Sequence, residues 1–186
     1  MKRLKSIWLL ILIFAQKAED AIYRWIAGVP TLQRSQITAN LFLGGQYDLR
    51  GLKELREMGI TAIINMRMNS VYADARFEGF SYLHLPTPDD TAPKLEDLIK
   101  GADFAHSVIE AGGKVYIHCR LGLGRGPTMA IAYLLRMGAT YEDAYETVRR
   151  VRTFIHPRPV QVQRLKELEA YFRQHEKTDE KLAPTV

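Results

Sequence analysis

The sequence predicts an α/β domain in which a small mixed central sheet is flanked by helices. Three observations predict this class. Short β-favouring runs alternate with amphipathic helical patterns, and one of these runs leads through a glycine-rich loop directly into a helix. The composition, with 47% hydrophobic and 25% charged residues, is ordinary for a globular protein. The 186 residues are enough for one domain with a substantial core.

An apolar and amphipathic segment, residues 1–30, precedes this domain. Its basic start is followed by nine apolar residues from Ile7 to Ala15, and residues 16–27 are amphipathic. Nine apolar residues are too few to span a bilayer, which needs about 20, and no small-x-small cleavage site follows. Three interpretations stay open: a helix over residues 4–27 that lies on a membrane surface, a cleaved signal peptide, and a helix that packs on the domain.

The first half of the domain reads as two strands enclosing a helix, with a further strand after them. Residues 37–45 favour β-structure and end in two glycines. Residues 48–58 carry apolar residues at helical spacing and end at Gly59. Residues 60–64 are almost continuously apolar, which is typical of a buried central strand, and residues 80–85 form the next strand.

The second half adds one strand and four helices, which completes the order β-α-β-β-α-β-loop-α-α-α. Residues 94–111 place their apolar side chains on one helical face, and residues 115–117 form a strand after two glycines. Three more helices are predicted at 129–137, 140–152 and 160–175. The charged end predicts a flexible tail of residues 176–186, so the domain itself comprises residues 31–175.

The stretch between the strand at 115–117 and the helix at 129–137 carries the main chemical signal. A glycine-rich loop at a helix N-terminus presents backbone N–H groups and a positive dipole, which suit a phosphate. Cys119 lies in this loop, where a bound anion site would favour the nucleophilic thiolate. Six positions later, the planar guanidinium of Arg125 can bind two phosphoryl oxygens. The alternative is a buried cysteine that acts only as a small hydrophobe.

The pattern His-Cys-x-x-Gly-x-x-Arg at residues 118–125 resembles the signature loop of the cysteine-dependent protein tyrosine and dual-specificity phosphatases. The resemblance implies the compact dual-specificity phosphatase fold over about residues 36–174, with Cys119 and Arg125 as catalytic residues. It also implies that the remaining loop residues bind the substrate, with His118 as a further site residue. These loop residues are Arg120, Leu121, Gly122, Leu123, Gly124 and Gly126.

Gly126 departs from the family pattern. The family usually has Ser or Thr directly after the arginine, and that hydroxyl helps to stabilise the thiolate during attack and when phosphocysteine is hydrolysed. Its absence bears on the rate of turnover more than on phosphate binding. Thr128, two residues further on, could supply a hydroxyl instead.

The proposed chemistry also requires an acid, because the leaving oxygen must be protonated as it departs. In the family, an aspartate on a loop roughly 30 residues before the cysteine does this. Asp89 and Asp90 lie 30 and 29 residues before Cys119, in a proline-rich loop. Residues 87–91 resemble the T-x-D-x-T form of this loop, which favours Asp89 as the acid, whereas Asp90 is better suited to capping the following helix.

Three segments together resemble the phosphatidylglycerophosphate phosphatase branch of the family: the T-x-D-x-T loop, the V-Y-x-H-C strand at 115–119 and the I-H-x-R-P-x-Q segment at 155–161. The last segment nominates Arg158 and Gln161 for positioning substrate or water. The alternative is a turn that seats the final helix.

Net charge and histidine spacing limit the expected partners and cofactors. A net charge of +5 favours anionic partners, but no basic run interleaved with aromatic residues indicates nucleic acid. The five histidines lack metal-ligand spacing, so we expect neither a metal nor another cofactor.

The sequence therefore predicts a phosphomonoester hydrolase that acts through cysteinyl phosphate on phosphorylated protein. The alternatives are a phospholipid phosphatase, suggested by the branch resemblance, and a catalytically weak phosphate-binding module, suggested by Gly126. We expect a location on the cytoplasmic side, with residues 4–27 as the candidate membrane attachment. The oligomeric state is left open.

Overall fold

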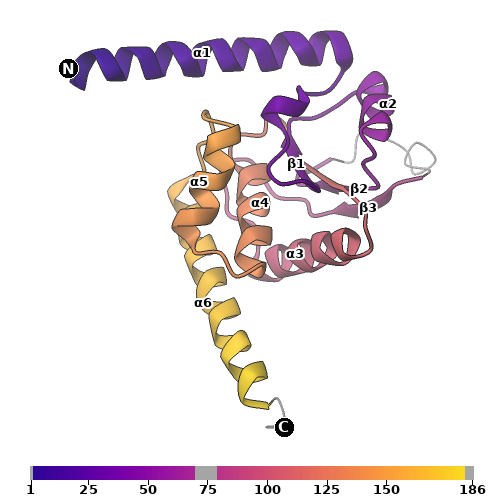
Figure 1. The fold of residues 1–186 in the computed structure, drawn as a ribbon, viewed down its shortest axis with the longest axis vertical. Helices are drawn as coiled ribbons and strands as arrows, with labels where there is room; N and C mark the ends of the chain where they lie inside the picture. Colours follow the sequence, from indigo (N-terminus) through magenta and orange to yellow (C-terminus); the bar gives the residue numbers. More distant parts are fainter. Residues whose placement is uncertain (1, 70–78, 183–186) are drawn as a thin grey trace.

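A computed structural model describes residues 2–69 and 79–182 of the chain (Figure 1). The predicted order of elements is confirmed, with one long helix and a short 3-10 turn before the first strand. The elements are α1 (Lys2–Ala27), η1 (Leu32–Arg34), β1 (Leu41–Gly44), α2 (Leu49–Glu57), β2 (Ala62–Asn65), β3 (Ser81–His84), α3 (Leu95–Glu110), β4 (Val115–His118), α4 (Arg125–Arg136), α5 (Tyr141–Val151) and α6 (Pro159–Leu182).

The four strands form one small sheet in the order β1-β4-β2-β3. All three strand pairs are parallel, which corrects the expectation of a mixed sheet. Helix α2 connects β1 to β2, and helix α3 connects β3 to β4. Each helix returns the chain to the starting end of the sheet, so that the two strands it connects run in the same direction. Antiparallel pairing within the described ranges is limited to an isolated bridge between Gln36 and Phe42.

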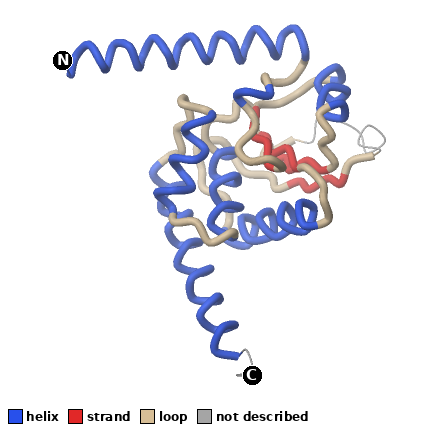
Figure 2. Tube along the Cα trace, viewed as in Figure 1, coloured by secondary structure: helices blue, strands red, loops and turns tan. Residues whose placement is uncertain are grey.

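The sheet separates two hydrophobic cores. Figure 2 shows its strands, in red, between helix α2 and helix α3. Strand side chains alternate between faces, so that Val115 and Ile117 of β4 enter the larger core while Tyr116 enters the smaller one. Helices α3, α4, α5 and α6 cover the larger core, with α4 contacting each of the other three helices. Helix α2 covers the opposite face. This arrangement leaves the end of β4 and the start of α4 at the centre of the domain.

Two helices differ from their predicted bounds. Helix α4 begins at Arg125, four residues before the predicted start, because Pro127 is tolerated in the first turn, where backbone N–H groups lack intrahelical partners anyway. Helix α6 runs to Leu182, so the segment expected as a tail from residue 176 begins inside a helix. Residues 183–186 lie outside the described residues.

Helix α1 crosses one side of the domain and its N-terminal part extends past the body (Figure 1). Among the side chains of α1 that the structure describes, Gln16 and Asp20 are buried, and both lie in its C-terminal half. Among the described residues, no helix combines the length and the apolar character that crossing a bilayer requires.

Candidate active site

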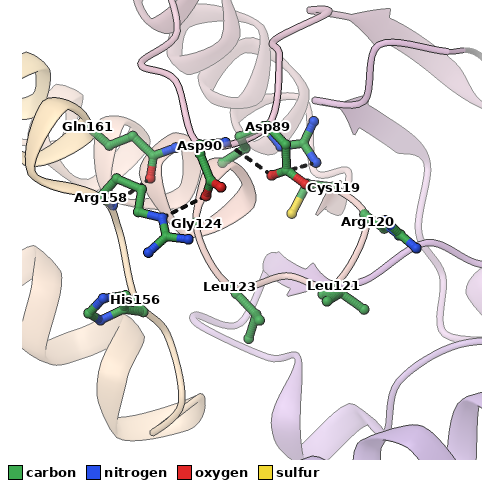
Figure 3. Close-up of a pocket in the computed structure, with 11 residues that line it drawn as sticks. Asp89, Asp90, Cys119, Arg120, Leu121, Leu123, Gly124, His156, Arg158 and Gln161 are labelled. Atoms are coloured by element: carbon green, nitrogen blue, oxygen red, sulfur yellow. Dashed lines mark hydrogen bonds and ion pairs between the residues drawn. The ribbon is translucent and has the colours of Figure 1, made fainter.

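A pocket of about 250 Å³ lies where β4 ends and the 119–124 loop leads into α4 (Figure 3). It is built from three segments that are distant in sequence: this loop, the loop before α3 and the segment before α6. The lining residues are Asp89, Asp90, Cys119, Arg120, Leu121, Leu123, Gly124, Arg125, His156, Arg158 and Gln161. The structure therefore brings together most of the residues that the sequence nominated.

Cys119 follows β4 directly and is 3% exposed. The backbone N–H of Gly122 donates a hydrogen bond to its Sγ at 3.2 Å, which is the kind of contact that stabilises negative charge on sulfur. Gly122 has a φ of +71°, and a Cβ at this position would lie 2.7 Å from the carbonyl oxygen of Gly44. Only glycine fits the turn that aims this amide at the sulfur.

Arg125, the first residue of α4, is buried beside the cysteine. Its Nη1 donates to the carbonyl oxygen of Thr87 at 2.8 Å, and its Nη2 lies 3.1 Å from Oδ1 of Asp89. Its Nε is buried and has no hydrogen-bond partner among the described residues. Leaving a buried donor without an acceptor costs free energy, so an anionic ligand that accepts from this guanidinium would be stabilised here.

The two candidate acids make different ion pairs. The exposed Asp89 carboxylate faces Arg125 within the pocket, as the dashed line in Figure 3 shows. Asp90 instead pairs with Nε of Arg158 at 2.6 Å, and this hydrogen bond lowers the pKa of the Asp90 carboxyl. Asp90 also has a φ of 60°, the left-handed region that non-glycine residues rarely adopt.

Gln161 links two walls of the pocket. Its Nε2 donates to the carbonyl oxygen of Thr91 at 2.8 Å, and its Oε1 accepts from the backbone N–H of Arg158 at 2.9 Å. The loop that carries both aspartates is thereby tied to the start of α6. Arg158 and Gln161 thus lie where the sequence placed them, and each is also engaged in fixing the pocket itself.

His118 lies beneath the loop and does not line the pocket. Burial disfavours the imidazolium and lowers the pKa of His118 to about 3, so the ring is neutral at ordinary pH. Its Nδ1 lies 3.3 Å from the carbonyl oxygen of Cys119, and its ring meets that of Tyr47 edge-on at 5.0 Å. His118 therefore supports the loop through packing rather than through charge.

The position of Gly126 borders the nucleophile. A Cβ built there would lie 3.5 Å from Cys119 Sγ and 2.9 Å from Cδ1 of Leu43. A hydroxyl at this position would thus reach the sulfur. The hydroxyl of Thr128 does not replace it, because it donates to the carbonyl oxygen of Gly124 at 2.9 Å within the first turn of α4.

The remaining loop residues form the rim. Arg120 and Leu121 are exposed, and the side chain of Arg120 points away from Cys119 (Figure 3). His156 also lines the pocket, and its backbone N–H donates to the carbonyl oxygen of Leu123 at 2.7 Å. His156 belongs to the I-H-x-R-P-x-Q segment, which nominated Arg158 and Gln161 but gave His156 no role of its own.

Arg152 is a second residue that the sequence could not reveal. Its side chain is 0% exposed and holds three segments together. Nη1 lies 2.7 Å from the carbonyl oxygen of Arg34 and 3.4 Å from Oδ1 of Asp20, and Nη2 lies 3.4 Å from the carbonyl oxygen of Leu121. The structure makes Arg152 a link between α1 and the cysteine loop.

The sequence of the chain is similar to those of known phosphatases. The family model described as "Dual specificity phosphatase, catalytic domain" matches residues 41–171. The chain is 34% identical to the mouse protein named "Dual specificity protein phosphatase 1" over 125 residues, which cover 66% of this chain and 33% of that protein. It thus spans about a third of the length of this relative.

A second relative is the human "Phosphatidylglycerophosphatase and protein-tyrosine phosphatase 1", which is 40% identical over 91 residues, or 48% of this chain and 45% of the relative. Among solved structures, that of PTPMT1 matches with a TM-score of 0.73 and 27% identity, covering 77% of this chain and 98% of the other. The active form of Tk-PTP matches with a TM-score of 0.69 and 30% identity, covering 73% and 95%.

Proposed function

This chain belongs to the dual-specificity phosphatase family, and from that premise we propose that it hydrolyses phosphomonoesters through a phosphocysteine intermediate on Cys119. The observation that carries the proposal is the composition of one pocket. The pocket holds a cysteine whose sulfur accepts a hydrogen bond from a loop amide. It also holds a buried arginine and an aspartate that is paired with this arginine.

In the first step, the Cys119 thiolate attacks phosphorus, forming the S–P bond as the P–O bond to the leaving group breaks. Loop amides and the Arg125 guanidinium bind the equatorial oxygens, on which negative charge develops. A phosphoryl group bound at Arg125 would supply the acceptor that its buried Nε lacks within the described part of the chain. It would also compete with Asp89 for this guanidinium.

Asp89 is the proposed acid. Once the phosphoryl group takes over Arg125, Asp89 is released from its ion pair, takes up a proton from solvent and donates it to the leaving oxygen. In the second step, the ionised carboxylate takes a proton from the attacking water, the S–P bond breaks, and phosphate leaves. Asp90 suits this role less well, because its pairing with Arg158 lowers the pKa of its carboxyl and so favours the ionised form.

The substrate class we propose is phosphorylated protein, as the names of the dual-specificity relatives suggest. A phospholipid is the second candidate. It is favoured by the similarity to the human relative named as a phosphatidylglycerophosphatase and by a similar solved structure, at 27% identity, described as PTPMT1 in complex with PI(5)P. The third candidate, a weak phosphate-binding module, rests on the missing hydroxyl at Gly126.

We assign this chemistry to residues 31–175, with residues 1–30 as an accessory segment. The test is phosphate release from p-nitrophenyl phosphate by the full chain and by Cys119→Ser, with vanadate as a ligand. Hydrolysis that is lost in Cys119→Ser supports the enzyme. Vanadate binding without any hydrolysis by the wild-type chain would favour the phosphate-binding module instead.

The substrate class needs a separate comparison. A panel that pairs phosphopeptides with phosphatidylglycerophosphate and a phosphoinositide, each at matched phosphate concentration, ranks the two candidates by kcat/KM. A clear preference for the phosphopeptides supports the main proposal, and the reverse preference supports the phospholipid.

A further inference from the structure

Helix α1 packs on the domain through polar side chains. Gln16 and Asp20 are both buried, although they are the kind of residue that a surface helix usually turns toward water. Gln16 accepts a hydrogen bond from the hydroxyl of Thr153, and Asp20 pairs with the buried guanidinium of Arg152. These contacts fix which face of the helix is covered.

The face that is left uncovered is apolar. Ten of the fifteen large hydrophobic side chains that are exposed in the described residues belong to α1, and the other five are scattered over the domain. The ten are Ile7, Trp8, Leu10, Ile11, Leu12, Phe14, Ile22, Tyr23, Trp25 and Ile26. So many exposed large apolar side chains on a single helix are unusual for a protein without a partner.

The two faces are opposite each other on the helix. At about 100° per residue, Ile7, Phe14 and Trp25 project in nearly one direction, and Gln16 and Asp20 project from the other side. Helix α1 therefore has the inverse of the usual polarity for a packed helix, with its polar side inward. In Figure 1 the N-terminal half also extends beyond the domain, so the apolar face continues past the packed region.

The charges on α1 favour an anionic partner. Its two acids are both paired with arginines of the domain: Glu19 with Arg34 at 3.0 Å, and Asp20 with Arg152 at 3.4 Å. The bases near them, Lys17 and Arg24, line cavities beside the cysteine loop instead. The sequence places three further bases, Lys2, Arg3 and Lys5, before the apolar run.

We propose that the outward face of α1 docks in the plane of an anionic lipid surface. An apolar face that is flanked by basic residues is the pattern of interfacial helices, which bury their apolar side at the boundary between headgroups and acyl chains. A cavity of about 230 Å³ separates α1 from the cysteine loop and is lined by residues of both, including Lys17, Arg24, Leu121 and Leu123. Docking would therefore bring the rim of the catalytic pocket beside the lipid surface.

Both tryptophans of the chain, Trp8 and Trp25, are among the exposed apolar residues of α1 and are 67% and 78% exposed. Tryptophan fluorescence of the full-length chain therefore reports directly on docking. On adding vesicles of phosphatidylcholine and phosphatidylglycerol, we expect a blue shift of the emission and protection from acrylamide quenching. Pure phosphatidylcholine vesicles should give a smaller response, and raised salt should weaken the anionic response.

Phe14→Glu places a charge in the centre of the face while retaining both tryptophans. We expect its affinity for the anionic vesicles, measured by flotation, to fall about tenfold. Met137→Glu is the control, because Met137 is also an exposed apolar residue, 49% exposed against 74% for Phe14, and lies away from α1 at the C-cap of α4. It should bind as the wild type does, and both variants should keep the wild-type unfolding midpoint.

Three outcomes would overturn the proposal. One is the absence of flotation and of any blue shift with anionic vesicles. Another is an equal loss of binding in Phe14→Glu and Met137→Glu. The third is a concentration-dependent blue shift without lipid, with dimers seen in sedimentation, which would make a second copy of the chain the occupant. None of these readouts depends on Cys119, so they are independent of the proposed hydrolysis.

Discussion

Two neighbouring acids on α1 allow a sharp test of how this helix is attached to the catalytic domain. Glu19 Oε2 lies 3.0 Å from Nη2 and 3.2 Å from Nε of Arg34, in a pair whose side chains are 42% and 26% exposed. Asp20 lies 3.4 Å from Arg152, in a pair whose side chains are 7% and 0% exposed. Distance alone would rank the Glu19 pair as stronger. Burial ranks the Asp20 pair as more costly to break.

Removing one partner of a buried ion pair costs about 3–5 kcal/mol, because the other charge stays buried without compensation. The loss of folding free energy in Asp20→Asn should lie at or below the lower end of this range, at about 2–3 kcal/mol. Asparagine retains a carbonyl oxygen, and Arg152 keeps its hydrogen bond to the Arg34 carbonyl at 2.7 Å. Glu19→Gln should cost about 1 kcal/mol or less, which is the usual contribution of an exposed pair.

Urea unfolding followed by circular dichroism measures both free energies, and thermal melts give a second reading. For a chain of this size, we expect the Tm of Asp20→Asn to fall by about 4–12 °C, and that of Glu19→Gln by about 4 °C or less. Asp20→Asn should also weaken vanadate binding, because Arg152 contacts the Leu121 carbonyl of the cysteine loop.

The reasoning would be refuted if the two variants lost equal stability, or if Glu19→Gln were the more damaging. Either result would mean that burial of the Arg152 guanidinium does not control the attachment of α1. Unchanged vanadate affinity in a destabilised Asp20→Asn would contradict the link to the loop while leaving the link to the helix intact.

Three further predictions concern the site. Asp89→Asn should lower kcat for an ester with a poor leaving group by about 10²–10⁴-fold in steady-state assays, whereas Asp90→Asn should change it by no more than a few-fold, since asparagine tolerates the same backbone conformation. Gly126→Ser should speed hydrolysis of the phosphocysteine by up to about tenfold in single-turnover phosphate release, because a hydroxyl there would stabilise the departing Cys119 thiolate. Burial lowers the pKa of His118 from an ordinary value of 6.5 to about 3. The contribution of the buried neutral imidazole to folding stability is therefore fully present above pH 6.5 and is lost as the pH falls. Urea unfolding should thus show that the wild type loses about 2 kcal/mol more than His118→Asn between pH 7 and pH 5.

Each of these has a contrary outcome. Equal losses in Asp89→Asn and Asp90→Asn would leave the acid unassigned. If Gly126→Ser kept the wild-type rate of phosphocysteine hydrolysis while folding normally, the missing hydroxyl would not be what limits that step. A parallel decline in stability for the wild type and His118→Asn would mean that the buried imidazole does not set the acid sensitivity.

The order of strands and helices followed from sequence periodicity because most elements have a clear apolar pattern and several of them end at a glycine. Residues 48–58 and 94–111, for example, end at Gly59 and Gly112, both of which have positive φ in the structure. The parallel direction of the sheet is a property of how the connections return, which local patterns do not encode. The start of α4 was expected at residue 129, where the apolar run begins, but proline is acceptable in the first turn and the helix begins at Arg125.

The pocket residues that sequence analysis found are those with local chemical context. Cys119 and Arg125 lie within one loop, and Asp89 precedes them in a recognisable proline-rich segment. Arg152 could not be found in this way, because its role depends on carbonyl groups and a carboxylate contributed by three distant segments. The inverted polarity of α1 was also beyond the sequence, since the pattern shows that two faces exist but not which of them the domain covers.

The central claim is that Cys119 carries the phosphoryl group, and trapping that intermediate tests it most directly. Asp89→Asn should slow hydrolysis of the phosphocysteine, so the phosphoenzyme should accumulate while this variant turns over p-nitrophenyl phosphate. A rapid acid quench then traps it. Mass spectrometry of the digested protein is expected to find one added phosphoryl group, on the peptide that contains Cys119, and none in Cys119→Ser. Turnover that persists in Cys119→Ser, with no phosphoryl adduct on the cysteine peptide at any quench time, would contradict the account.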